Sequence, residues 1–166
     1  MSDERSPRLA LPLLQPGQAQ KETDHNEALT LLDIAAQAAV LAVGLDNPPV
    51  DPAPGECWIV GTAPTGAWNG YAGALAGWTA GGWRFVAPTP GMTAWSIADD
   101  MSARYEAGTW WLGEIRAERV LIDGVQVLGP RGSAIPDPGG GVSVDAEARA
   151  AISAMLNALR SHGLIE

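Results

Sequence analysis

Aromatic side chains carry the clearest candidate chemistry of this sequence. Trp68, Tyr71 and Trp78 lie within the Gly-rich, uncharged segment GAWNGYAGALAGW, with Asn69 between the first two. Aromatic faces stack on sugar rings, and a neighbouring amide can hydrogen-bond sugar hydroxyl groups. These four residues are therefore a candidate carbohydrate-binding site.

The competing interpretation is that tryptophan fills the core. The chain has seven tryptophans and one phenylalanine, and all seven tryptophans lie between residues 56 and 128. A small β-domain with a single phenylalanine can use tryptophan as its main large apolar side chain. This interpretation best suits the tryptophans that fall within strand candidates, which are Trp58, Trp83, Trp95 and Trp110.

A nucleophile with its base cannot be assembled from the remaining side chains. The two histidines, His25 and His162, lie near opposite ends of the chain, and neither is close in sequence to Cys57. A cysteine nucleophile needs such a base, and the GxSxG elbow of serine hydrolases is absent. Cys57 alternates with Ile59 in a strand candidate, so we expect it to be buried.

Carboxylates give two weaker candidates. Asp99, Asp100 and Glu106 could supply an acid pair for glycoside hydrolysis, but turn and surface positions explain such acids at least as well. His25 shares one helical turn with two acids that could help it to hold a metal, although helix capping explains those acids equally well. We therefore predict a protein that is not an enzyme and has no cofactor or metal.

Composition narrows the class of protein. Of the 166 residues, 46% are hydrophobic, 20 are Gly and 13 are Pro, which favours strands joined by many turns. A net charge of −9 argues against nucleic acid and anionic membranes as partners. The single cysteine excludes an internal disulfide, and the Pro-interrupted N-terminus does not resemble a signal peptide. We expect synthesis in a bacterial cytoplasm.

The first 55 residues predict an arm, a helix and a connector. Residues 1–22 form a Pro-broken arm, and residues 23–44 predict a helix that Asp24 caps with Glu27 in a capping box. Residues 46–55 contain four prolines and predict a stiff connector after an N-terminal segment of residues 1–45. The apolar face of the helix would consist of Leu29, Leu32, Ala36, Ala39 and Val43.

Residues 56–128 predict a small, antiparallel, Trp-rich β-domain. Arg84 is the only charged residue between Cys57 and Ala98. Tight turns are expected at residues 106–108 and 81–82, and Asp123-Gly124 suits a type I′ hairpin over residues 120–127. The other strand candidates are Cys57–Val60, Ala74–Trp78, Trp83–Ala87, Thr93–Ile97, Ala103–Tyr105 and Thr109–Leu112.

The C-terminal part predicts a linker and an amphipathic helix. Residues 129–143 form the Gly/Pro linker, and residues 144–166 contain the helix, with Asp145 as its N-cap and Gly163 in a left-handed C-terminal position. The whole chain is thus of the α+β class. The helix could pack on its own β-domain or on copies from other subunits, and the candidate oligomer interface is Ile152, Met155, Leu156 and Leu159.

Several motifs in fixed order resemble a known family. These are PGQAQKE, HNEAL, GAWNG and GGWRF, within a stretch covering about residues 8–97. They resemble uncharacterised domains in alphaproteobacterial prophages and gene transfer agents, in tail-fibre or head-spike proteins. The C-terminal stretch VQVLGPRGSAIPDP followed by DAEARAAISAMLNALRSHGLI is similar to the ends of such appendage proteins.

The resemblance implies a virion component rather than an enzyme. It implies a spike, or a fibre base or adaptor, that takes part in host attachment on the surface of a phage-like or gene-transfer-agent particle after lysis. Its partners would be capsid, tail or fibre proteins, and the chain would form a homo-oligomer, by default a trimer, or a pentamer at a capsid vertex. The alternative is a module that binds host capsular or surface polysaccharide. The short chain favours a base or adaptor that joins a fibre to a particle, or a compact spike.

Overall fold

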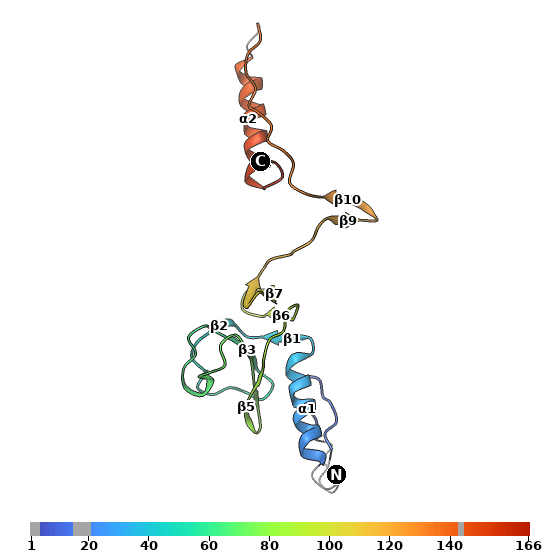
Figure 1. The fold of residues 1–166 in the computed structure, drawn as a ribbon, viewed down its shortest axis with the longest axis vertical. Coiled ribbons are helices and arrows are strands. Elements are labelled where there is room, and N and C mark those ends of the chain that lie inside the picture. The colour runs from blue at the N-terminus through green and yellow to red at the C-terminus, as the bar shows by residue number, and fades with distance from the viewer. Residues whose placement is uncertain (1–3, 15–20, 143–144) are drawn as a thin grey trace. The chain divides into compact units, whose positions relative to one another are not determined.

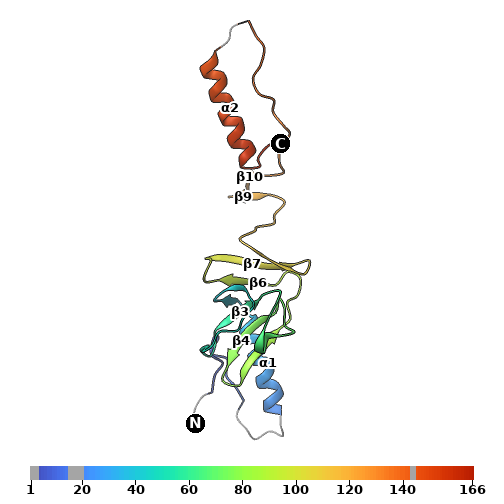
Figure 2. The ribbon, with the colours of Figure 1, turned by 90° about the vertical axis from the view of Figure 1, so that its left-hand side faces the viewer.

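The computed structural model describes residues 4–14, 21–142 and 145–166. Most of the motif PGQAQKE and the predicted helix start at Val144 lie outside these ranges. The chain divides after Glu114 into two compact units, unit 1 (Met1–Glu114) and unit 2 (Ile115–Glu166). This division falls inside the range 56–128 that the sequence favours as one domain. The N-terminal helix therefore belongs to the same unit as most of the strands (Figures 1 and 2).

Among its described residues, unit 1 contains two four-stranded sheets, one α-helix and the short 3-10 helix η1 (Gly66–Trp68), so the α+β class predicted from the sequence is confirmed. The first sheet has the order β2-β3-β4-β5 and the second has the order β1-β6-β7-β8. All pairs of sequence-adjacent strands within these sheets are antiparallel except β2 with β3, and β1 also pairs in parallel with β6. The strands are β1 (Ala38–Val40), β2 (Val43–Leu45), β3 (Cys57–Val60), β4 (Leu75–Thr79), β5 (Gly82–Val86), β6 (Thr93–Ser96), β7 (Met101–Glu106) and β8 (Thr109–Leu112).

The six predicted strands of this unit form where local signals are strong. Cys57–Val60 and Thr109–Leu112 have the predicted bounds, and the other four shift by one or two residues. The turn between β7 and β8 consists of Ala107 and Gly108, both with positive φ (49° and 83°), as a type I′ turn requires. The turn between β4 and β5 consists of Ala80 and Gly81, because Gly82 already pairs with Thr79.

The predicted helix over residues 23–44 is wrong in its second half. Helix α1 spans Lys21–Ala35, Gln37 has a positive φ of 46°, and β1 and β2 follow. The apolar run after Ala35 joins two sheets through parallel pairing with β6 and β3, which are distant in sequence. Tertiary pairing therefore overrides the helical spacing.

The predicted capping box and apolar face of this helix are also corrected. Asp24 lies within the first turn of α1 rather than before it, so Glu27 does not occupy the capping-box position. Leu32 is exposed, whereas Asp33 and Ile34 are buried. Ile34 packs where β4 has Gly77, and a Cβ at that glycine would lie 2.6 Å from Ile34 atoms. Contact between helix and sheet therefore requires the glycine.

The N-terminal arm is held on α1 by the buried carboxylate of Asp33. Its Oδ1 accepts from the Ser6 hydroxyl (2.6 Å) and from the Leu9 N–H (2.6 Å), and its Oδ2 accepts from the Arg8 N–H (3.0 Å). The Arg8 guanidinium donates to carbonyl groups at the end of the helix, including those of Ile34 (3.2 Å) and Gln37 (2.9 Å). A cation at this position also complements the helix dipole.

Unit 2 contains a hairpin and a helix. The strands β9 (Val120–Ile122) and β10 (Val125–Leu128) pair around Asp123 and Gly124, whose φ angles of 49° and 78° confirm the predicted turn. Helix α2 spans Ala146–Ser161, and the predicted cap is confirmed because Asp145 accepts from the Ala148 N–H (2.8 Å). No helix among the described residues is long and apolar enough to cross a membrane.

We expect Asp33→Ala to lower the free energy of unfolding by about 3 kcal/mol, because it leaves three donors of the arm without their acceptor. Urea denaturation measures this change, and limited proteolysis would detect release of the arm. The control is Asp51→Ala at an exposed position, for which we expect a change within about 0.5 kcal/mol. Equal effects of the two substitutions would contradict the anchoring role of Asp33.

Candidate aromatic site and oligomer interface

Four tryptophans form one aromatic cluster on the first sheet. The Trp83 ring lies edge-on to three others, with centroid distances of 5.5 Å to Trp58, 5.1 Å to Trp68 and 5.0 Å to Trp78. Trp83 and Trp78 face each other across the β4–β5 pair. Edge-to-face packing at these distances stabilises aromatic pairs beyond the burial of their area. The core interpretation therefore holds for Trp58, which is buried, and in part for Trp83 and Trp110, which are half-buried and pack against the core. It is wrong for Trp95, which is 46% exposed.

Trp68 belongs to this core, which corrects its assignment to a carbohydrate site. The short helix η1 (Gly66–Trp68) turns its side chain inward, and the residue is 0% exposed. Trp58 and Trp83 occupy the space around its ring. A sugar can stack only on an accessible ring face, so Trp68 cannot serve as a platform.

Tyr71 remains available to a ligand. It lies just after η1 and stacks in parallel on Phe85, with a centroid distance of 3.7 Å and an interplanar angle of 6°, yet it is 45% exposed. Its N–H donates to the Trp68 carbonyl (3.0 Å), which ties the loop to the core residue. Beside the pair lies a hollow of about 200 Å³ whose lining residues are Gly70, Tyr71, Ala72, Ala74, Phe85, Ala87 and Pro88.

The other two predicted residues do not line this hollow. Asn69 is exposed and lies two positions before Tyr71, so its amide is on the same loop. Trp78 is half-buried and packs edge-on against Trp83 at an interplanar angle of 65°. The structure therefore places Asn69 and Tyr71 together on the η1–β4 loop and places Trp78 on the β4–β5 hairpin.

The four residues of the predicted oligomer interface lie on one stripe of α2 but differ in burial. Leu156 is buried within unit 2, together with Ile165 at the C-terminus. The segment around Ile165 bonds to Gly132, whose N–H donates to the Leu164 carbonyl (2.7 Å). Ile152 and Met155 are exposed (41% and 59%), and Leu159 is half-buried. Ile152, Met155 and Leu159 are three and four residues apart, which is the spacing of a coiled-coil seam.

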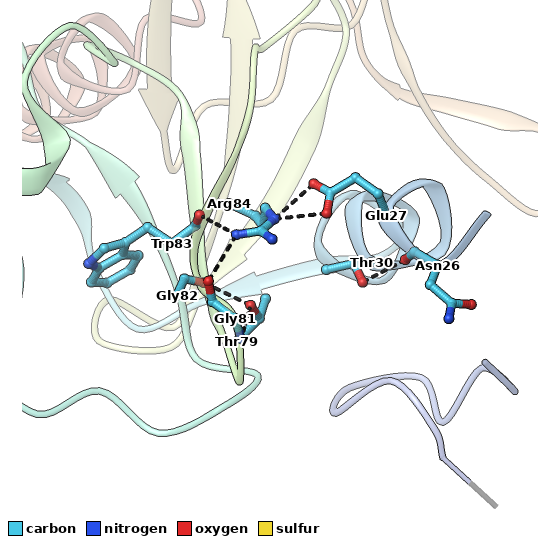
Figure 3. A network of polar contacts seen from close by, with 8 residues as sticks. All are labelled: Asn26, Glu27, Thr30, Thr79, Gly81, Gly82, Trp83 and Arg84. Carbon is cyan, nitrogen blue, oxygen red and sulfur yellow. Dashed lines mark hydrogen bonds and ion pairs between the residues drawn. The ribbon is translucent and has the colours of Figure 1, made fainter. Parts of the chain in front are cut away.

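A polar network that the sequence analysis missed joins α1 to the β4–β5 hairpin (Figure 3). The Arg84 Nε donates to both carboxylate oxygens of Glu27, at 2.8 and 2.9 Å. The same guanidinium donates to the carbonyls of Gly81 (3.2 Å) and Trp83 (3.0 Å). The signal was present in the sequence, since Arg84 is the only charge in a 42-residue stretch.

Cys57 and Asp99, two of the residues considered for catalysis, occupy positions that structural contacts explain. Cys57 is buried, as expected, and burial raises the pKa of its thiol to about 11, against a lowering influence of Arg8. Asp99 accepts from the buried Ser96 hydroxyl (2.5 Å), which explains one member of the acidic group. Among residues 4–14, 21–142 and 145–166, no group of three or more His, Cys, Asp or Glu side chains could hold a metal ion.

Comparison with known proteins gives one family. The model of the family described as "Protein of unknown function (DUF2793)" matches residues 25–111, a little over half of the chain. The match begins within α1 and ends within β8, so it lies entirely in unit 1. No curated protein matches the chain.

We expect the Cys57 thiol to react with Ellman's reagent at pH 8 only after unfolding, because about one folded molecule in a thousand carries the thiolate at a pKa of about 11. The proton is retained in the folded chain but lost from the unfolded chain between about pH 9 and pH 11. The protonated Cys57 thiol therefore makes its full contribution to the free energy of unfolding below pH 9, and this contribution is lost as the pH rises from about 9 to 11. Cys57→Ala should lack this loss, and equal thiol reactivity before and after unfolding would contradict the prediction.

Proposed function

The chain belongs to the DUF2793 family, and we propose that it is a structural subunit of an appendage on a phage-like or gene-transfer-agent particle. It acts there as a spike, or as the base or adaptor of a fibre, and takes part in host attachment. Unit 1 supplies a rigid body, and unit 2 assembles with other subunits. The partners are further copies of this chain and other particle proteins of the capsid, tail or fibre.

The observation that carries this proposal is the exposed apolar surface of unit 2. Its hairpin exposes six apolar side chains, each between 40% and 66%: Val120, Leu121, Ile122, Val125, Val127 and Leu128. Among its described residues, Leu156 and Ile165 are the only buried ones. A folded unit that leaves this much apolar surface in water is expected to bury it against a partner.

Pairing within the hairpin shows that the apolar surface is two-sided. Val125 pairs with Ile122, and Val120 lies two positions before Ile122, so these three side chains share one face. The register shifts between Gln126 and Leu128, and Leu128 pairs with Val120. Leu121 lies on the other face, opposite Gln126. A two-stranded hairpin alone is marginal in water, and a short unit with two buried apolar residues has little core. These facts support an obligate assembly in which unit 2 is completed by other subunits.

Copies of this chain are the simplest partners for unit 2. Each copy presents the same hairpin and the same seam of Ile152, Met155 and Leu159, and closed symmetric assemblies of identical subunits are the usual solution. Three copies are the default for a fibre. The sequence resemblance to phage and gene-transfer-agent appendage proteins supports the particle as the setting.

A second candidate function is glycan binding by unit 1. The specific observation in its favour is the Tyr71 ring, stacked on Phe85 beside the hollow and 45% exposed. Phe85 fixes the plane of the tyrosine, and Asn69 supplies an exposed amide on the same loop. A pre-oriented aromatic face with a nearby amide suits a sugar ring of a host capsular or surface polysaccharide. The two functions are compatible in one attachment protein.

We expect Ile152→Asp combined with Leu159→Asp to convert the oligomer into monomers, because two charges would then lie in the seam of α2. Multi-angle light scattering measures the mass. The control places the same two charges elsewhere on this helix, with Ala150→Asp and Asn157→Asp at exposed positions, and should leave the oligomer intact. A wild-type chain that is monomeric at all accessible concentrations would contradict the proposed assembly.

We expect Tyr71→Ala to weaken glycan binding at least tenfold while the near-ultraviolet circular dichroism of the tryptophan cluster persists, because the exposed ring is lost and the core is not. The assay is co-sedimentation with encapsulated and capsule-deficient cells. Tyr71→Phe keeps the ring and should retain most binding. Binding that is equal for both kinds of cell, or unaffected by Tyr71→Ala, would exclude this site.

A further inference from the structure

The second sheet of unit 1 has one face in the core and one face with an exposed tryptophan. Ala94 and Ser96 of β6 are buried at 4% and 0%, whereas Trp95 between them is 46% exposed. Because side chains alternate along a strand, Thr93 and Trp95 lie on the side opposite the core. The inner side of this sheet packs into the core of unit 1, since Ala94 and Ala103 belong to the main core cluster.

Strand register defines the other members of this surface. Ser102 is opposite Trp95, Arg104 is opposite Thr93, and Trp111 of β8 is opposite Arg104. We call this surface the outer face; its members are Thr93, Trp95, Ser102, Arg104 and Trp111. Two tryptophans therefore lie on the outer face, on the strands either side of the one that carries Arg104.

We infer that the outer face packs against a neighbouring copy of this chain in the assembled oligomer. The composition fits a protein interface, because tryptophan and arginine are enriched at the energetic centres of such contacts, which polar and solvent-accessible residues surround. Here Thr93 and Ser102 are exposed beside the aromatic and arginine side chains. The inference rests on the proposed assembly of unit 2.

Internal contacts hold this surface in a fixed arrangement. The Arg104 guanidinium forms an ion pair with Glu106, two positions along β7. The Trp111 Nε1–H donates to the Glu106 backbone carbonyl at 3.3 Å. Side chains that are already ordered lose less entropy when a partner binds. The ion pair also neutralises Arg104 locally, so two copies that each carry a net charge of −9 can approach here without adding like charge.

The chain itself brings a second copy close to the outer face. Strand β8 ends at Leu112 and β9 begins at Val120, so seven residues join the sheet to the hairpin of unit 2. The eight Cα–Cα steps from Leu112 to Val120 span at most about 28 Å when fully extended. Once the C-terminal units assemble, each sheet is therefore tethered near its copies. Tethering of this kind raises the local concentration to about the millimolar range, at which a modest contact is occupied.

Hydroxyl-radical footprinting tests this inference on the full chain. Trp95 and Tyr71 are almost equally exposed in one chain, at 46% and 45%, so Tyr71 is an internal reference. We expect Trp95 to oxidise at least fivefold more slowly in the wild-type oligomer than in the monomer made by Ile152→Asp with Leu159→Asp. Tyr71 should change less than twofold between the two samples.

The outcomes separate this inference from the proposed assembly. Equal oxidation of Trp95 in oligomer and monomer overturns the inference and leaves the assembly intact. Protection of Trp95 in both samples also overturns it, because the cover would then come from the same chain. A wild-type chain that light scattering shows to be monomeric overturns the assembly and the inference together.

A second variant decides the question if the doubly substituted chain fails to fold. Trp95→Ala should raise the dissociation constant of the oligomer about tenfold in sedimentation equilibrium, because it removes the proposed centre of the contact. Tyr71→Ala is the matched control and should leave that constant unchanged. An unchanged constant for Trp95→Ala overturns the inference.

Discussion

The buried carboxylate of Asp33 is the interaction on which the N-terminal half of unit 1 depends. It accepts hydrogen bonds from Ser6, Arg8 and Leu9 and thereby holds the arm on α1. The arm in turn places the Arg8 guanidinium at the carbonyl end of the helix, where it satisfies backbone acceptors. Because the chain leaves the helix at this point to enter β1, one buried acid fixes both the arm and the start of the sheets. A buried charge is tolerable here because its acceptor capacity is used.

The second constraint is the contact between α1 and the aromatic sheet. Ile34 packs against Gly77, and the Glu27 carboxylate accepts from Arg84 on the β4–β5 hairpin. One apolar and one polar contact therefore hold the same helix on this sheet. The hairpin that receives them also carries Trp78 and Trp83 of the aromatic cluster. Helix and cluster therefore support each other, and the residues of both contacts lie within the segment that the family model matches, residues 25–111.

Local signals predicted much of the fold, and long-range pairing explains the main error. Strands β3 to β8 of unit 1 and the turn at Asp123-Gly124 follow from alternation and turn residues. The residues after Ala35 have helical spacing and yet form β1 and β2, because their partners β6 and β3 lie far along the chain. For the same reason the sequence could not show that Trp68 is interior while Tyr71, three residues later, is exposed. The assignment depends on where η1 meets the sheet, which no local pattern reports.

The two units differ in how they satisfy their apolar side chains. Unit 1 buries its own core under α1 and between two sheets, although eight large apolar side chains of its described residues are exposed, Trp95 among them. Unit 2 buries Leu156 and Ile165 and leaves its hairpin exposed. In the assembly that we propose, contacts of unit 2 with other copies take the place of a core, because they bury the apolar side chains that the unit leaves exposed. In that proposed assembly, the seven residues that connect unit 2 to β8 keep the second sheets of neighbouring copies within reach of one another.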